Sequence, residues 1–216
     1  MSRKAVIILS GGMDSTTLAY DLHSRGYKLF ALSFDYGQRH VKELQMAMIT
    51  THKLGIPHEI VDLSGLAPLL ASALTSSDIE VPEGHYADDN MKATVVPNRN
   101  MIMLSIAIGY AITVGADTVA YGAHSGDHAI YPDCREEFVQ AMQGAAGLCH
   151  FEPVTLWAPY IHINKNDIAI LGKHLKVPYA DSWTCYKGQE KPCGVCGSCV
   201  ERSEAFKYAL MEDPLL

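Results

Sequence analysis

The amino-acid sequence predicts an α/β protein built on a doubly wound parallel sheet. Short apolar runs rich in β-branched residues alternate with longer segments of helical periodicity, and glycines close several of the helical segments. This alternation is typical of repeated strand–helix–strand units in a Rossmann-like sheet with helices on both faces. A cysteine-rich segment near the carboxyl end interrupts the pattern and predicts a small zinc-binding addition.

The first strand–helix–strand unit occupies the beginning of the chain. Residues 5–9, Ala-Val-Ile-Ile-Leu, are continuously apolar, as expected of a strand that is buried on both faces. Apolar residues at helical spacing predict a helix over residues 14–25, which should end at Gly26. A second strand is predicted over residues 27–34.

The same alternation continues along the rest of the chain. The later predicted elements are a helix over 39–54, a strand over 58–63, a helix over 99–114, a strand over 118–123, a strand near 151–156, a helix near 165–175 and a closing helix over 200–210. Residues 75–97 are mostly polar and contain two prolines, so we expect an irregular excursion near the mouth of the site. A disordered surface loop is the alternative.

Composition and length indicate one globular core with a small appendage. The 216 residues are 48% hydrophobic and 19% charged, which is ordinary for a globular protein. We expect an α/β domain over residues 1–180, followed by a four-cysteine zinc-binding segment and closing helix over residues 181–216.

The charge balance favours small-molecule substrates over nucleic acid. The chain has 17 Lys and Arg against 24 Asp and Glu, a formal net charge of -7, which is the wrong sign for neutralising many phosphates. No apolar run approaches the roughly 18 to 20 residues of a membrane span, and we identify no signal peptide. We therefore expect a cytoplasmic protein with neither membrane nor nucleic-acid partners.

A glycine-rich turn joins the first predicted strand to the first predicted helix. Residues 10–15 read Ser-Gly-Gly-Met-Asp-Ser, and their amides, hydroxyls and helix dipole would hold an anion. The turn is neither a Walker A loop nor a Gly-x-Gly-x-x-Gly turn. A tight turn capped by Asp14 or Ser15 is the structural alternative. The residues predicted to form this binding site are Leu9, Ser10, Gly11, Gly12, Met13, Asp14, Ser15 and Thr16.

This turn resembles the pyrophosphate loop of the N-type ATP pyrophosphatases. Those enzymes cleave ATP between its α and β phosphates and transfer AMP to an acceptor, so the resemblance implies a loop that holds the leaving pyrophosphate. Because pyrophosphate is highly charged, we expect Mg²⁺, with Asp14 as a direct or water-mediated ligand. The predicted catalytic residues are Ser10, Asp14, Ser15, Arg99 and Lys165.

Four cysteines near the carboxyl end have the spacing of a metal site. Cys185, Cys193, Cys196 and Cys199 would provide four thiolates, a closed tetrahedral set that predicts structural zinc. An iron–sulfur cluster is one alternative. The other is a zinc nucleobase deaminase site, because residues 150–152 read His-Phe-Glu and residues 192–196 read Pro-Cys-Gly-Val-Cys.

Five separated segments together resemble the 7-cyano-7-deazaguanine synthase family. They are the loop at 10–15, Phe-Asp-Tyr-Gly-Gln-Arg-His at 34–40, Val-Pro-Asn-Arg-Asn at 96–100, Tyr-Pro-Asp-Cys-Arg at 131–135, and the cysteine cluster with Arg202. The resemblance covers nearly the whole chain. It implies an adenine nucleotide α-hydrolase-like fold, a homodimer, and ATP-dependent conversion of 7-carboxy-7-deazaguanine and ammonia to the nitrile through an amide, in queuosine-type biosynthesis.

Several polar residues follow predicted strands, where open parallel sheets bind their ligands. The predicted substrate-binding residues are Tyr36, Gln38, Arg39, Arg99, Asp127, Asp133 and Arg135. Arg99 would pair with a carboxylate or phosphate, and Asp127 or Asp133 would read the guanine-like edge of the base. Helix-start, turn and surface ion-pair roles are the alternatives. Lys165 resembles a family position near the phosphates, with a solvated lysine as its alternative, and Cys134 is interpreted as a packed thiol.

The sequence differs from the family pattern at one place, and three alternative functions remain open. Many family members have a Ser-Gly pair before the Tyr-Pro-Asp-Cys-Arg run, where this chain has His-Ala-Ile at residues 128–130. A relative that stops at the amide, or joins the base to a protein amine, would keep the loop. A tRNA-thiolating relative and a nucleotide sensor without turnover fit the sequence less well. No glutaminase domain fits beside this core, so ammonia is expected from solution or a separate partner.

Overall fold

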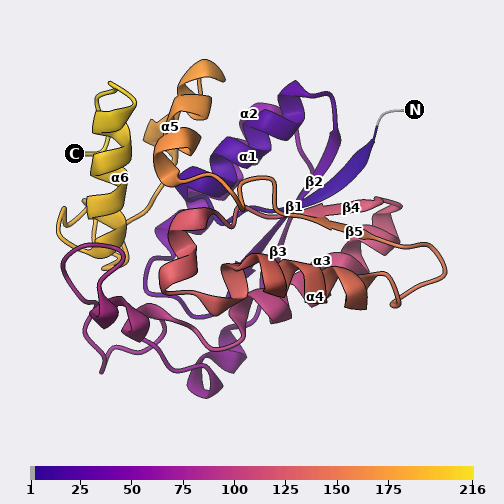
Figure 1. The fold of residues 1–216 in the computed structure, drawn as a ribbon, viewed down its shortest axis with the longest axis horizontal. Helices are drawn as coiled ribbons and strands as arrows, with labels where there is room; N and C mark the ends of the chain where they lie inside the picture. The colour runs from indigo at the N-terminus through magenta and orange to yellow at the C-terminus, as the bar shows by residue number, and fades with distance from the viewer. Residues whose placement is uncertain (1–2) are drawn as a thin grey trace.

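The computed structural model describes residues 3–216 and confirms the parallel, doubly wound sheet (Figure 1). Its five strands lie in the order β3-β2-β1-β4-β5, and all neighbouring pairs are parallel. The strands are β1 (Lys4–Ile8), β2 (Lys28–Asp35), β3 (His58–Asp62), β4 (Thr118–Ala120) and β5 (Thr155–Trp157). Because β1 lies between β2 and β4, chain order reverses across it, which is the position where such sheets bind ligands.

Helices cover both faces of the sheet (Figure 1). The α-helices are α1 (Met13–Ser24), α2 (Lys42–Leu54), α3 (Arg99–Val114), α4 (Glu136–Ala146), α5 (Lys165–His174) and α6 (Gly197–Tyr208). Side chains of β1 alternate between two cores: Val6 packs in the cluster with α3 and α4, and Ile7 packs with α1, α2 and α5. This two-sided burial explains why the first strand is a continuous apolar run.

The predicted elements differ from the structure at several ends. The helix predicted over 39–54 begins only at Lys42, because residues 39–41 form a turn. The strand predicted over 118–123 ends at Ala120, and the one predicted near 151–156 is β5, shifted to Thr155–Trp157. The closing helix begins earlier than predicted, at Gly197.

Helix α4 was missing from the sequence prediction. Its apolar residues Phe138, Val139, Met142 and Ala146 lie three or four positions apart, with one adjacent pair, and pack against the core formed by α3 and β5. The helix also fixes the end of the sheet, because Gln143 Oε1 accepts a hydrogen bond from the backbone N–H of Leu156. A helix between β4 and β5 completes the crossover connection that a parallel pair requires.

The irregular excursion is confirmed, and it is packed onto the protein. It contains the 3₁₀ turn η2 (Asp89–Thr94), while Tyr86 and Met91 are buried in the main core. Glu83 forms an isolated antiparallel bridge with Cys196, so this segment lies beside the start of α6 (Figure 1). The alternative of a disordered loop is therefore not supported.

The cysteine-rich segment is anchored to the α/β core by buried polar contacts. The N–H of Trp183 donates to the carbonyl of Gly11, which joins this segment to the glycine-rich loop. Arg202 on α6 is 2% exposed and donates to Asp213, Ser182 and Thr184, which closes the carboxyl-terminal turn over the helix. Among residues 3–216, no helix has the length and apolar character needed to span a membrane.

Candidate active site at the carboxyl edge of the sheet

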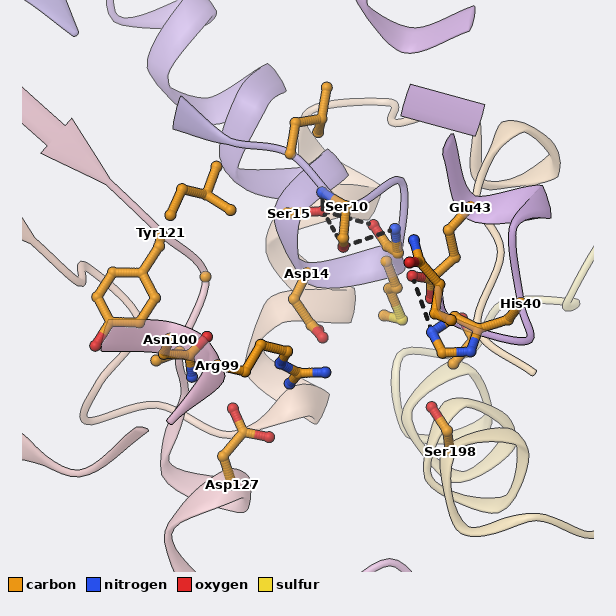
Figure 2. A pocket seen from close by; sticks show the side chains of 18 of the residues that line it. Ser10, Asp14, Ser15, His40, Glu43, Arg99, Asn100, Tyr121, Asp127 and Ser198 are labelled. Atoms are coloured by element: carbon orange, nitrogen blue, oxygen red, sulfur yellow. Dashed lines mark hydrogen bonds and ion pairs between the residues drawn. The ribbon is translucent and has the colours of Figure 1, made fainter. Parts of the chain in front are cut away.

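A pocket of about 200 Å³ opens where β1, β2 and β4 end. It is bounded by the glycine-rich loop, the start of α3, the turn after β2 and the cysteine-rich segment. In Figure 2 the side chains of Asp14, Arg99 and Asp127 point into one space, although they come from segments far apart in the chain. The position is the one expected for a ligand site in an open parallel sheet.

The glycine-rich loop is shaped by two hydroxyls and by close contact with α2. Ser10 Oγ lies 3.0 Å from Ser15 Oγ and accepts a hydrogen bond from the N–H of Gly12 at 3.2 Å. Gly11 has φ +87°, and a Cβ there would lie 2.0 Å from the carbonyl oxygen of Glu43. Only glycine fits this position. Ser10, Ser15 and the first turn of α1 therefore face the pocket together.

Most of the predicted nucleotide residues line the pocket. They are Leu9, Ser10, Gly12, Met13, Asp14 and Ser15. Thr16 is fully buried behind the loop, and Gly11 packs against α2, so these two residues shape the loop from outside the pocket lining.

Lys165 is buried between two carboxylates. Its Nζ lies 3.1 Å from Asp14 Oδ2 and 2.7 Å from Glu201 Oε2, and its side chain is 7% exposed. Burial opposes the charged form, but the two carboxylates outweigh burial and raise the pKa of Lys165. The alternative of a solvated lysine is wrong, because this cation is held inside the pocket wall.

Arg99 enters the pocket from the first turn of α3. Its Nη1 donates to the Tyr36 hydroxyl at 3.1 Å, and its guanidinium carbon lies 5.6 Å from the Tyr36 ring centroid. Gln38 also lines the pocket, but its amide is occupied locally: Oε1 accepts from the N–H of Tyr36, and Nε2 donates to the carbonyl of Phe34. Gln38 therefore holds the turn that presents Tyr36.

Asp127 lies in the turn that follows β4 and lines the same pocket. Its Oδ1 accepts a hydrogen bond from Tyr86 at 3.0 Å, and its Oδ2 accepts from the N–H of His124 at 3.2 Å. Tyr86 packs against Tyr131, with ring centroids 5.9 Å apart. An acidic group beside two aromatic rings can bind a planar base that carries N–H donors.

Three predicted substrate residues lie outside the pocket lining. Arg39 is exposed and donates to the carbonyl of Ile79, and Arg135 is exposed and donates to the carbonyl of His128. Asp133 accepts a hydrogen bond from the N–H of Asn100 at 3.1 Å and so supports the first turn of α3. Their substrate roles stay predictions without a place in this pocket.

Several lining residues were not among the predicted site residues. They include His40, Glu43, Tyr86, Asn100, Tyr121, Tyr131, Trp183, Thr184, Tyr186 and Ser198. His40, Asn100 and Tyr131 lie inside the segments that carry the family resemblance. Glu43 lies outside every segment quoted from the sequence. It reaches the pocket because α2 packs closely against Gly11.

The four cysteines form one compact group. Their sulfur atoms all lie within 4.8 Å of one another, and Cys185, Cys196 and Cys199 are buried. The N–H of Cys193 donates to Cys185 Sγ at 3.4 Å, and hydrogen bonds from Cys196 and Cys199 lower the pKa of Cys185. This set of thiols fits a metal that prefers four sulfur ligands.

The deaminase alternative fails on geometry. Residues 150–152 lie on an exposed turn before β5, at the other end of the molecule from α6 (Figure 1). Within the described part of the chain, the possible metal group contains the four cysteines alone. A His-Glu-Cys-Cys site is therefore not formed.

Cys134 is a packed thiol, as interpreted from the sequence. It is 7% exposed and accepts a hydrogen bond from Asn100 Nδ2 at 3.3 Å. Burial raises the pKa of Cys134, so the reactive thiolate is disfavoured.

Comparisons with known proteins agree along the whole chain. The family model described as "Queuosine biosynthesis protein QueC" matches residues 4–210. A 7-cyano-7-deazaguanine synthase of Methanoregula boonei is 57% identical over 212 residues, covering 98% of both chains. Enzymes of the same name from Caldicellulosiruptor bescii and Marinobacter nauticus are 56% and 53% identical, with coverage of 98% and 100% of this chain and 96% and 97% of theirs.

Solved structures of more distant proteins share the fold. A 4-thiouridine synthetase in complex with RNA and ATP superposes with a TM-score of 0.54 at 15% identity, covering 96% of this chain and 50% of that one. An NH3-dependent NAD synthetase of Campylobacter jejuni superposes with a TM-score of 0.52 at 17% identity, covering 84% and 67%. At these identities the likeness shows the adenine nucleotide α-hydrolase-like fold alone.

Proposed function

The chain belongs to the QueC family of queuosine biosynthesis proteins, and from this premise we propose that it is an enzyme that makes 7-cyano-7-deazaguanine. Its substrates are 7-carboxy-7-deazaguanine, ammonia and ATP, which is cleaved to AMP and pyrophosphate. The observation that carries the proposal is identity of more than half the residues over 98% of the chain. The pocket supports it, because an anion-binding loop, a buried cation and an acidic base-reading group meet there.

The glycine-rich loop binds the phosphates of ATP. The hydroxyls of Ser10 and Ser15 and the N–H groups at the positive end of α1 face the pocket and can donate to an anion. Asp14 is the residue that would hold Mg²⁺, which would neutralise the leaving pyrophosphate. Its Oδ1 fits this role, because that atom is buried and has no hydrogen-bond partner among the described residues.

Lys165 and Arg99 supply the positive charge that the reaction needs. Lys165 is fixed beside Asp14, so its ammonium faces the same phosphates as the loop. Arg99 projects from the opposite wall and can pair with the substrate carboxylate or the α-phosphate. Both cations stabilise negative charge that grows as the bond between the α and β phosphates breaks.

The chemistry proceeds by two adenylations. A carboxylate oxygen is a poor leaving group and must first be activated. The carboxylate attacks the α-phosphate of ATP, pyrophosphate leaves, and an acyl adenylate forms. Ammonia attacks the activated carbon and AMP leaves, which gives the amide. A second ATP adenylates the amide oxygen, and loss of AMP and protons leaves the nitrile.

Asp127 recognises the base. Its carboxylate can accept hydrogen bonds from a guanine-like N–H and exocyclic amine, while Tyr86 and Tyr131 provide an aromatic surface beside it. The hydrogen bonds from Tyr86 and from the N–H of His124 hold the carboxylate in one orientation. Binding therefore places the substrate carboxyl group at a fixed distance from the phosphate loop.

The four cysteines bind zinc in a structural role. All four ligand positions are filled by the protein, which leaves none for a reacting group. Zinc would hold the start of α6, where Ser198 lines the pocket between Cys196 and Cys199. We further propose, from the family resemblance, a cytoplasmic homodimer that takes ammonia from solution or from a partner.

The test is incubation of the purified protein with 7-carboxy-7-deazaguanine, ATP, Mg²⁺ and ammonium, followed by mass spectrometry of the bases. The expected result is the nitrile, with AMP and pyrophosphate in proportion to two adenylations. An amide as the final product, despite excess ATP and ammonium, would contradict the second adenylation. Absence of AMP would contradict the assigned substrate.

A further inference from the structure

Glu43 is a pocket residue to which the mechanism above gives no role. It lies in the first turn of α2, and its side chain is 13% exposed and lines the pocket. Figure 2 shows it beside His40, whose Nε2 lies 3.4 Å from Glu43 Oε2. Among residues 3–216, no group donates a standard hydrogen bond to either oxygen of this carboxyl. A carboxyl that is mostly enclosed by the pocket wall and receives no hydrogen bond from the protein is free to accept hydrogen bonds from a ligand.

The backbone fixes Glu43 against the phosphate loop. Its carbonyl oxygen occupies the space where a Cβ of Gly11 would lie, and Oε1 would lie 3.9 Å from a Cβ at Gly12. The carboxyl group therefore stands next to the loop that would hold the phosphates. A ligand between Glu43 and the loop would be close to an adenylated substrate.

The surroundings of Glu43 favour the neutral form of its carboxyl, chiefly because the group is enclosed by the protein. Burial raises the pKa of Glu43 to about 8, Arg99 and Lys165 oppose that rise, and Asp14 adds to it. His40 does not supply a compensating cation, because burial lowers the pKa of His40 to about 3. His40 Nδ1 is also buried without a hydrogen-bond partner among the described residues.

The proposed reaction needs a group that removes a proton from its nitrogen source. At neutral pH ammonia is mostly ammonium, whose lone pair is occupied by a proton, so ammonium cannot attack a carbon. A base with a pKa close to the working pH can accept that proton and later release it. Asp14 and Glu201 are already paired with Lys165, and Asp127 is hydrogen bonded to Tyr86.

We propose that Glu43 binds ammonium beside the phosphate loop and removes one proton from it. This inference rests on the proposed function, because that function requires ammonia as a substrate. The Glu43 carboxylate takes the proton and becomes neutral. The nitrogen lone pair forms the C–N bond, the C–O bond to AMP breaks, and AMP leaves with the bonding electrons. The second proton passes from nitrogen to solvent.

The test compares two nucleophiles in Glu43→Gln, which keeps the shape of the side chain and removes the base. Ammonium must lose a proton before it attacks, whereas hydroxylamine is mostly unprotonated at neutral pH. We expect AMP release with ammonium to fall about 100-fold, the scale of general-base catalysis, and release with hydroxylamine to fall less than about tenfold. Raising the pH should restore part of the ammonium rate in the variant. Glu59→Gln, at an exposed position on β3, is the matched control.

Each other outcome overturns the inference. An equal loss with both nucleophiles would mean that Glu43 supports the fold or the adenylation step. A loss that excess Mg²⁺ restores would make Glu43 a metal ligand. Glu43→Asp, which keeps a shortened carboxylate, should retain more ammonium-dependent rate than Glu43→Gln, and the reverse order would also contradict a base. Failure of the wild type to make amide or nitrile would instead contradict the proposed function itself.

Discussion

Lys165 on α5 donates a 2.7 Å hydrogen bond to Glu201 on α6. The same ammonium lies 3.1 Å from Asp14 of the phosphate loop, so one buried cation joins the loop to the helix that starts within the cysteine cluster. Glu201 follows Cys199 by two residues. The cysteine-rich segment is thereby connected to the proposed phosphate loop through a direct charge contact.

Removal of the Lys165 charge should affect both stability and activity. Lys165→Met leaves Asp14 and Glu201 as two partly buried carboxylates without their cation, which should cost less than the roughly 3–5 kcal/mol of breaking a fully buried pair. We expect a lower thermal midpoint and a loss of nitrile formation of at least about 100-fold. Lys92→Met, which changes an exposed lysine on η2, should leave both unchanged.

A double variant separates these two effects. Lys165→Met with Glu201→Gln removes one of the two stranded charges, so denaturant unfolding should show part of the lost stability restored. Activity should stay low, because the cation beside the phosphates is still missing. Recovery of activity in the double variant would contradict a phosphate role for Lys165.

The cysteine cluster should bind one zinc ion that the fold depends on. Cys196→Ser removes a buried ligand at the N-cap of α6 and should lower both metal content and thermal midpoint. Cys149→Ser changes an exposed cysteine outside the cluster and is the matched control. Elemental analysis and an absorption spectrum check this prediction, since a coloured protein containing iron would indicate an iron–sulfur cluster instead.

A comparison of alanine substitutions at Gly11 and Gly26 should separate the cost of backbone strain from the cost of a steric clash. Both have positive φ, +87° and +78°, but a Cβ at Gly26 meets nothing within 4 Å, while a Cβ at Gly11 overlaps the Glu43 carbonyl. Gly26→Ala should cost about 1–2 kcal/mol of unfolding free energy. Gly11→Ala should cost more and abolish pyrophosphate release. Equal unfolding curves for the two variants would contradict the packing explanation.

Much of the fold follows from local signals in the sequence. The first buried strand, predicted over 5–9 and found at Lys4–Ile8, the helix ends near Gly26 and Gly55, and the loop between β1 and α1 could all be predicted, because each depends on neighbouring residues. Helix α4 was missed because no glycine or proline separates its start from the preceding motif. Its helical pattern is short and begins immediately after Arg135.

The site was less predictable, since it depends on contacts between distant segments. Asp127 and Asp133 stand in the same motif region, and sequence alone gives no reason to separate them. The fold directs Asp127 to Tyr86, 41 residues earlier, and directs Asp133 to the N–H of Asn100. Glu43 reaches the pocket only because Gly11 lets α2 approach the loop.

The two aspartates should therefore respond differently to substitution. Asp127→Asn replaces a carboxylate, which only accepts hydrogen bonds, with an amide whose NH₂ group would face an N–H donor of the base. We expect KM for the deazaguanine acid to rise about 10-fold to 100-fold, which corresponds to about 1–3 kcal/mol. Asp133→Asn should leave that KM unchanged and lower the thermal midpoint slightly. Steady-state kinetics with varied base at saturating ATP checks both, and a larger KM effect for Asp133→Asn would reverse the assignment.

Glu43 should make the stability of the ligand-free protein depend on pH. Its pKa is about 8 in the folded protein against an ordinary value of 4.5, so the folded state holds a proton that the unfolded state releases earlier. Unfolding free energy should consequently decrease as pH rises from about 4.5 to about 8, because the unfolded state binds fewer protons throughout that interval. Glu43→Gln cannot lose a proton, so its stability relative to wild type should increase over the same interval. Urea unfolding of both proteins at several pH values, with Glu59→Gln as control, measures this difference. A constant difference between wild type and Glu43→Gln would show that the carboxyl is ionised in the folded protein.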